Sequence, residues 1–187
     1  KIAWLFPGQG AQAVGMGHDV FQTSPAARAV FQQVDEALGD KLSSLCFRGP
    51  MAELTLTANT QPAIMATSAA LLAALRERYP GLAAPSCAAG HSLGEYSALH
   101  AAGVMGLGDA VRTCRVRGRS MQEAVPEGKG AMAAVMNLGG EQVDALCQRA
   151  SDPSEQVGCA NFNAPSQTVI AGHAAAVARA CELAVAA

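Results

Sequence analysis

Residues Gly90-His91-Ser92-Leu93-Gly94 form a G-x-S-x-G pattern whose setting constrains the fold more than any other part of the sequence. The short apolar run at 86–89 predicts a buried strand, and residues 93–102 predict a helix. A strand, a sharp turn between glycines and a helix together form a nucleophile elbow. The pattern therefore predicts an α/β unit that presents the Ser92 hydroxyl at a helix start, where free N–H groups can stabilise an oxyanion.

The same serine has a purely structural interpretation. Ser92 followed by Glu95 is also a capping box, in which both side chains satisfy the first N–H groups of a helix. Both interpretations can hold, because an elbow serine stands at a helix start. We assign Glu95 to capping and Ser92 to nucleophilic chemistry.

The segments before residue 128 alternate between strands and helices, which predicts an α/β class with a parallel sheet. We expect residues 1–127 to form an α/β-hydrolase-like core that contains the elbow. Its other segments are a buried parallel strand at 2–6, a loop with four glycines at 8–17, and helices at 25–38, 60–79 and 107–121.

The pattern changes after Gly128, so we expect residues 128–187 to form a small α+β subdomain. The predicted order is β-α-β-β-α, which is a ferredoxin-like unit without its closing strand. The strands are expected at 131–136, 156–162 and 167–171, and the helices at 141–149 and 174–186.

Composition excludes several classes of function. The net charge is −2, and no basic stripe suggests binding to nucleic acid. No apolar run approaches the roughly 20 residues of a membrane helix. The six cysteines form no C-x-x-C pair and no metal-ligand spacing, so we expect no metal site and mostly buried, reduced thiols in a cytoplasmic protein.

Several short motifs, in the same order along the chain, resemble those of the bacterial malonyl-CoA:acyl-carrier-protein transacylase family. The resemblance covers nearly the whole chain, and the motifs together are far more specific than G-x-S-x-G alone. They are Phe6-Pro7-Gly8-Gln9-Gly10, Gln61-Pro62-Ala63, Gly90 to Ala98, Arg117-Gly118 with Met121-Gln122, Asn161 to Pro165, and Gln167 to Gly172.

The resemblance implies an acyltransferase for fatty-acid or polyketide biosynthesis. Ser92 would take a malonyl group from coenzyme A and pass it to the phosphopantetheine thiol of acyl carrier protein, without a bound cofactor. Backbone N–H groups of Gln9 and Leu93 would form the oxyanion hole. Arg117 would bind the malonyl carboxylate. Gln61 and Asn161 would line the pocket, although each could equally be a hydrogen-bonding residue of a helix start or loop. The aliphatic Leu93 favours malonyl over methylmalonyl, and we expect a monomer.

Helical geometry gives an independent reason to single out Arg117. On the predicted 107–121 helix, Arg117 lies about 65° from the centre of the apolar face, whereas Arg112, Arg115 and Arg119 lie about 95–155° away. An inward-leaning guanidinium needs an anion. That anion is either the substrate carboxylate or a carboxylate of the protein.

The sequence offers no general base for Ser92. His100 lies about 12 Å further along the same predicted helix. His173 should cap the last helix or face solvent, and the side chain of His91 should diverge from its neighbour. The family's catalytic histidine follows the closing strand of the small subdomain, so we expect the chain to stop before both and to be inactive alone.

Two other functions remain open. A serine esterase of the α/β-hydrolase type would need an aspartate and a histidine downstream, and it does not account for the motifs at 6–10 and 61–62. A catalytically inactive fragment that only binds carrier protein is the second alternative.

Overall fold

The computed structural model describes residues 1–125 and 128–187, and the chain divides into two compact units, Lys1–Ala124 and Val125–Ala187. The first contains a parallel sheet and the second an antiparallel sheet, so the predicted mixed α/β class is confirmed. The assignment of an α/β-hydrolase-like core and a ferredoxin-like subdomain stays a prediction. The predicted boundary between 127 and 128 involves residues 126–127, which lie outside the described residues.

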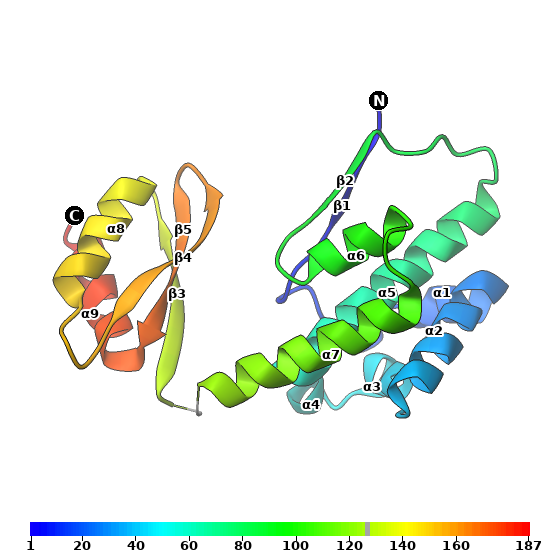
Figure 1. Ribbon diagram of the computed structural model, residues 1–187, viewed down its shortest axis with the longest axis horizontal. Helices are drawn as coiled ribbons and strands as arrows, with labels where there is room; N and C mark the ends of the chain where they lie inside the picture. The colour runs from blue at the N-terminus through cyan, green and yellow to red at the C-terminus, as the bar shows by residue number, and fades with distance from the viewer. Residues whose placement is uncertain (126–127) are drawn as a thin grey trace. The chain divides into compact units, whose positions relative to one another are not determined.

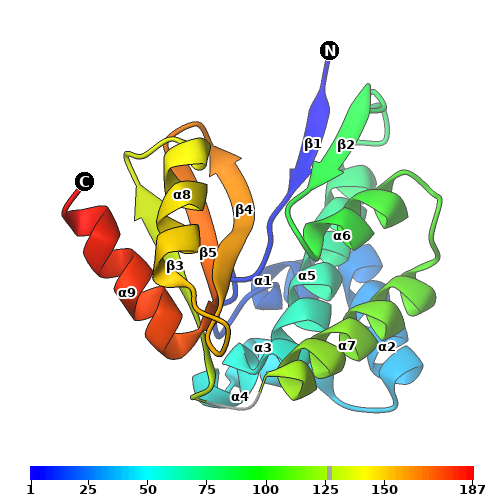
Figure 2. The same cartoon turned by 60° about the vertical axis from the view of Figure 1, so that its left-hand side comes forward.

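The first unit is built around the long helix α5, which α2, α6 and α7 surround (Figures 1 and 2). Because α5 is rich in alanine, serine and threonine, its neighbours can pack against it closely, and its middle is buried on all sides. The helices are α1 His18–Thr23, α2 Pro25–Leu38, α3 Leu42–Arg48, α4 Met51–Thr55, α5 Thr57–Arg78, α6 Gly94–Ala101 and α7 Leu107–Ala124.

Local chemistry explains the ends of α2. The Ser24 hydroxyl accepts a hydrogen bond from the Ala27 N–H at 3.1 Å, and Pro25 occupies the first helical position. Gly39 then ends the helix with a φ of 66°. The prediction of α2 is confirmed at both ends. Helix α5 begins at Thr57 rather than Thr60, because Leu56 O accepts bonds from both Asn59 and Thr60 N–H.

Strands β1, Ala3–Phe6, and β2, Cys87–Gly90, pair in parallel from Ala3 opposite Cys87 to Phe6 opposite Gly90. Both were predicted to be buried, which is wrong. Exposure alternates along β1, and Leu5 is 78% exposed. Parallel strands are buried only where helices cover both faces of their sheet, and the described residues cover one face of this pair.

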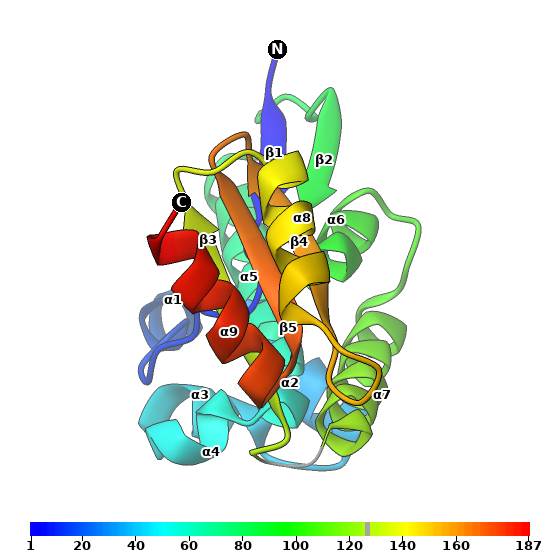
Figure 3. The same cartoon turned by 90° about the vertical axis from the view of Figure 1, so that its left-hand side faces the viewer.

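The second unit follows the predicted order β-α-β-β-α, with β5 in the centre of an antiparallel β3-β5-β4 sheet. Helices α8 and α9 pack together on one face of it (Figure 3). Val135, Ile170 and Val177 belong to its core. The elements are β3 Gly130–Met136, α8 Gly140–Ala150, β4 Val157–Ala164, β5 Gln167–His173 and α9 Ala174–Val185.

The cysteines are free, but only half of them are buried. Cys46, Cys114 and Cys147 are buried, whereas Cys87 is exposed because it lies on the half-covered β2. Within the described part of the chain, no helix is long and apolar enough to cross a membrane, and no cluster of side chains could hold a metal ion.

Candidate functional site

The turn between β2 and α6 holds Ser92 in a conformation that side chains other than glycine rarely adopt. Its φ is 55°, and Ser92 and Asn137 are the only described non-glycine residues with a positive φ. Such a conformation costs about 1–3 kcal/mol and persists only when the surroundings enforce it. This backbone is typical of a nucleophile elbow.

The surroundings that enforce the turn are the glycines on either side of Ser92. A Cβ on Gly90 would lie 1.9 Å from backbone atoms of Gly94. A Cβ on Gly94 would lie 2.5 Å from the carbonyl oxygen of Phe6, at the end of β1. The G-x-S-x-G spacing therefore reflects backbone segments in direct contact, which leaves no room for a side chain at either position.

The predicted capping box is wrong. Helix α6 begins two residues after Ser92, its N-cap is Leu93, and no side chain caps it. An N-cap serine needs an extended backbone, which the positive φ of Ser92 excludes. The Glu95 N–H donates to the backbone carbonyl of Ser92 instead, and the Glu95 side chain is exposed. The Ser92 hydroxyl is thus not used in capping.

Three of the predicted site residues come together around that hydroxyl. Arg117 Nη2 on α7 donates to Ser92 Oγ at 3.1 Å, and its Nη1 donates to Gln61 Oε1 at 2.6 Å. Gln61 is fully buried on α5. Helices α5 and α7 therefore hold the guanidinium against the serine.

Met121 also belongs to this group, and the prediction of site residues omitted it. Gln61 Nε2 donates to Met121 Sδ at 3.2 Å, which fixes the orientation of the amide. Met121 lies one helical turn after Arg117 on α7. The i, i+4 spacing of these two residues in the sequence could have indicated that they share a face of the helix.

The alternative partner of Arg117, a carboxylate of the protein, is not found among the described residues. The ion pairs of the described residues use Lys41, Arg112, Arg115 and Arg179, but not Arg117. Its partners among the described residues, Gln61 and Ser92, are neutral and do not compensate its positive charge. A partly buried guanidinium in this state is suited to binding an anion beside Ser92.

The prediction that Arg117 alone of the four arginines leans inward is wrong. Arg115 is more deeply buried, with 9% of its surface exposed. It donates to Asp40 Oδ2 at 2.7 Å and to Asn59 Oδ1. Burial lowers the pKa of Arg115, and the nearby Asp40 partly offsets this. An apolar-face calculation cannot foresee such burial, because polar partners on other elements cause it.

The loop that contains Gln9 lies directly against the turn before Ser92. A Cβ on Gly8 would lie 2.7 Å from the carbonyl oxygen of His91, and the His91 N–H donates to Phe6 O at 3.1 Å. Gln9 is exposed and its amide donates to Thr57 Oγ1 at 3.2 Å, whereas Leu93 is buried. Among the described residues, the backbone N–H groups of Gln9 and Leu93 donate no hydrogen bond.

The hydrogen bonds of His18, His100 and His173 go to groups other than the Ser92 hydroxyl. His100 Nδ1 lies 3.1 Å from Met105 O, beyond the far end of α6. His173 is exposed at the start of α9, where its Nδ1 accepts a bond from the Gln156 N–H. His91 turns its ring toward Gly8. The hydrogen-bond partner that the structure gives Ser92 Oγ is therefore the Arg117 guanidinium, a cation.

Asn161 belongs to the second unit. It lies on β4 opposite Val169, next to an irregularity in the pairing with β5, and is partly exposed. Ser92 belongs to the first unit, so the predicted role of Asn161 in the pocket stays a prediction.

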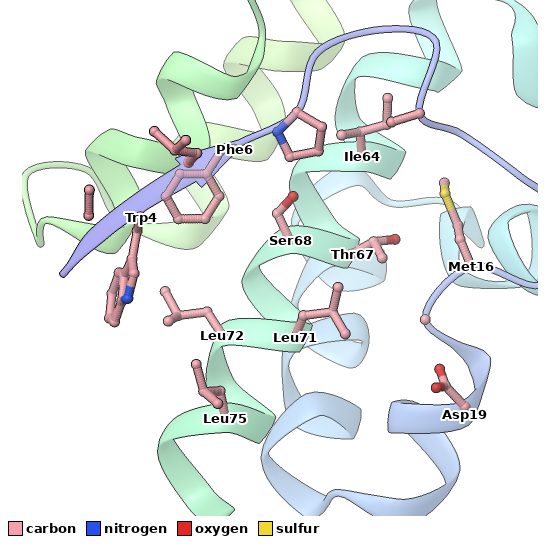
Figure 4. A pocket seen from close by; sticks show the side chains of 15 residues that line it. Trp4, Phe6, Met16, Asp19, Ile64, Thr67, Ser68, Leu71, Leu72 and Leu75 are labelled. Carbon is pink, nitrogen blue, oxygen red and sulfur yellow. The ribbon is translucent and has the colours of Figure 1, made fainter. Parts of the chain in front are cut away.

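An apolar hollow of about 620 Å³ lies in the first unit between β1 and α5 (Figure 4). Trp4, Phe6, Leu71 and Leu72 line it, together with other apolar side chains, and Asp19 is its charged residue. Neither Ser92 nor Arg117 is among its lining residues. The hollow shares Phe6 with the surroundings of the Ser92 turn, but it does not include the Ser92 and Arg117 side chains.

Comparison with known proteins agrees with the predicted family. The acyl transferase domain family matches residues 3–186. The malonyl CoA-acyl carrier protein transacylase of Bacillus subtilis is 50% identical over 184 residues, which make up 98% of this chain and 57% of the relative. The corresponding Escherichia coli K12 protein is 47% identical over 180 residues, 96% of this chain and 57% of the relative.

Solved structures give the same result. An acyl-carrier-protein S-malonyltransferase from Burkholderia pseudomallei superposes with a TM-score of 0.91 at 44% identity, covering 99% of this chain and 59% of that one. A malonyl-transacylase in complex with a type II PKS acyl-carrier protein gives 0.93 at 44% identity, covering 100% and 59%. The chain thus spans less than two thirds of these relatives, and it belongs to the acyl transferase family, in which it resembles the bacterial malonyl-CoA:acyl-carrier-protein transacylases.

Proposed function

We propose that the protein transfers a malonyl group from coenzyme A to the phosphopantetheine thiol of acyl carrier protein through a malonyl ester on Ser92. The observation that carries the proposal is the Arg117 guanidinium, which lies 3.1 Å from Ser92 Oγ and has no carboxylate partner among the described residues. A malonyl thioester carries a free carboxylate one carbon away from its reactive carbonyl. A cation beside the nucleophile therefore selects this substrate over an acetyl thioester.

The reaction proceeds in two steps, formation of the Ser92 ester and transfer from it. Ser92 Oγ attacks the thioester carbonyl and loses its proton, the C–S bond breaks, and coenzyme A leaves as a thiol. The phosphopantetheine thiol then attacks the Ser92 ester and returns a proton to Oγ. The backbone N–H groups of Gln9 and Leu93 stabilise the oxyanion in both steps. The carbonyl needs no cofactor, because a thioester is already activated.

The relatives support the partners in this proposal. One structural neighbour is described as a malonyl-transacylase in complex with its carrier protein. Curated relatives are malonyl CoA-acyl carrier protein transacylases. We extend both substrates to this protein, in fatty-acid or polyketide synthesis, and we place it in the cytoplasm, where its free thiols stay reduced.

Intact mass spectrometry after incubation with malonyl-CoA tests the proposal. The reaction should be followed over hours, so that slow acylation is also detected. The expected product is one malonyl adduct, which is absent in Ser92→Ala and is removed by holo acyl carrier protein.

The other outcomes contradict the proposal in different ways. Release of free malonate without a stable adduct would indicate a serine esterase. Binding of carrier protein without any adduct, even after long incubation, would indicate a protein that only docks its partner.

A further inference from the structure

The contact between α5 and α7 has a feature that the proposed transferase chemistry does not use. Two arginines that lie two residues apart on α7 donate to two side-chain carbonyls that lie two residues apart on α5. Arg117 binds Gln61, and Arg115 binds Asn59. Only the first of these pairs touches Ser92.

The geometry of α7 explains why both arginines turn toward α5. Cys114 and Gly118 face the contact, and a Cβ on Gly118 would lie 2.6 Å from the Thr57 carbonyl oxygen. At about 100° per residue, Arg115 lies about 80° to one side of the line between Cys114 and Gly118, and Arg117 lies about 80° to the other. The two guanidinium groups therefore flank the contact, and a rotation of α7 that withdraws one advances the other.

The Arg115 flank is the more firmly anchored. Its Nη2 binds the Asp40 carboxylate at 2.7 Å, in the segment between α2 and α3. Its partner Asn59 is itself held, because Asn59 Nδ2 donates to Glu53 O at 2.9 Å. Arg115 thus ties α7 to two other segments, one through a carboxylate, whereas Arg117 is held by two neutral groups.

We propose that Arg115 is a positioning residue for Arg117: by binding Asp40 and Asn59 it fixes the rotation of α7 and so holds the Arg117 guanidinium at Ser92. This role of Arg115 rests on the proposed function, in which Arg117 binds the substrate carboxylate. It predicts that loss of Arg115 reduces malonyl selectivity without removing any group that touches the substrate.

A competition between malonyl-CoA and acetyl-CoA for acylation of Ser92 tests this role. In Arg115→Met, the ratio of malonyl to acetyl adduct should fall about ten-fold, because a small misplacement of a positioning group is costly. Arg115→Lys keeps the charge that attracts Asp40 but lacks the two separate nitrogens that bind Asn59 and Asp40, so it should recover only part of the ratio. Arg112→Met removes an exposed pair with Asp109 on the same helix and should leave the ratio unchanged.

A second measurement does not depend on catalysis. In the protein without substitutions, the hydrogen bonds to Gln61 and Ser92 should slow the exchange of the Arg117 guanidinium protons with water, so that their signals are visible in ¹H–¹⁵N NMR spectra. These signals should broaden or shift in Arg115→Met. If the protein without substitutions forms no adduct, the proposed transferase function is refuted. The NMR measurement would still decide the role of Arg115 in that case. Unchanged Arg117 signals, or equal losses of both adducts in proportion to the folded fraction, would show that Arg115 only stabilises the fold.

Discussion

Ser92 combines a costly backbone conformation with a side chain that is held by a cation. A positive φ at a serine is maintained only by contacts around it, here the close approach of Gly90, Gly94 and the end of β1. The hydroxyl is kept out of helix capping and is directed to Arg117. At the scale of single residues, the site is thus a fixed serine hydroxyl beside a positive charge that no carboxylate of the described residues neutralises.

Replacing Arg117 by alanine should therefore separate two substrates. We expect acylation by malonyl-CoA to fall about 10- to 100-fold more than acylation by acetyl-CoA, because a hydrogen bond to a charged group contributes about 1.5–3 kcal/mol. Rates of adduct formation with each thioester measure the effect. Equal losses for the two thioesters would contradict the assignment of Arg117 to the substrate carboxylate.

At the scale of elements, the contact between α5 and α7 determines whether Arg117 can reach Ser92. Gly118 permits the close approach, since its missing Cβ would overlap Thr57 O. Gln122 Oε1 accepts a bond from the Ala58 N–H at 3.3 Å and satisfies part of the α5 N-terminus from α7. The register of the two helices thus depends on small and polar residues rather than on large apolar ones.

Gly118→Ala should consequently destabilise the protein by about 1–3 kcal/mol, because overpacking forces the helices apart. Gly108→Ala on the same helix is the matched control. Its Cβ would meet the movable Arg112 guanidinium at 3.3 Å and lie in ordinary contact with Ala37 Cβ at 3.6 Å, so it should stabilise α7 by up to about 1 kcal/mol. Urea denaturation followed by circular dichroism measures both, and the same sign of change in the two variants would contradict this account of the contact.

The elements that could be predicted from the sequence are those with enough length or strong end signals. Helix α2 was predicted to the residue, from its periodicity and Gly39. Helices α1, α3 and α4 were not predicted, because five to seven residues cannot show a helical period. Helix α3 also depends on a partner in another element, since Asp35 on α2 accepts bonds from the backbone N–H and the hydroxyl of Ser43.

The same limit applies to the site. Ser92, Gln61 and Arg117 could be predicted because sequence motifs mark them. The structure brings these three residues together. Arg115 was missed, since its burial depends on Asp40 and Asn59, which lie 75 and 56 residues away in the chain. Periodicity reports which face of a helix is apolar, but it does not report which polar groups another element brings to it.

At the scale of the whole molecule, each unit has its own core. One core is built from α2, α5 and α7 with their neighbours, and the other from the sheet and helices of residues 125–187. Buried cysteines report on both. Burial raises the pKa of Cys46 and Cys114 in the first core to about 12, and that of Cys147 in the second to about 11. All three thiols are therefore unreactive while their unit is folded.

These thiols can show whether the two units unfold separately. The ordinary thiol pKa is 9.0, so the unfolded chain loses these protons at lower pH than the folded chain does, and stability should fall as the pH rises above about 9. At about pH 8, a pulse of iodoacetamide should label the exposed Cys87 without urea. With increasing urea, Cys147 should become labelled before Cys46 and Cys114, because the smaller unit buries less apolar surface. Peptide mass spectrometry identifies each site, and simultaneous labelling of all three at one urea concentration would show that the two cores unfold as one.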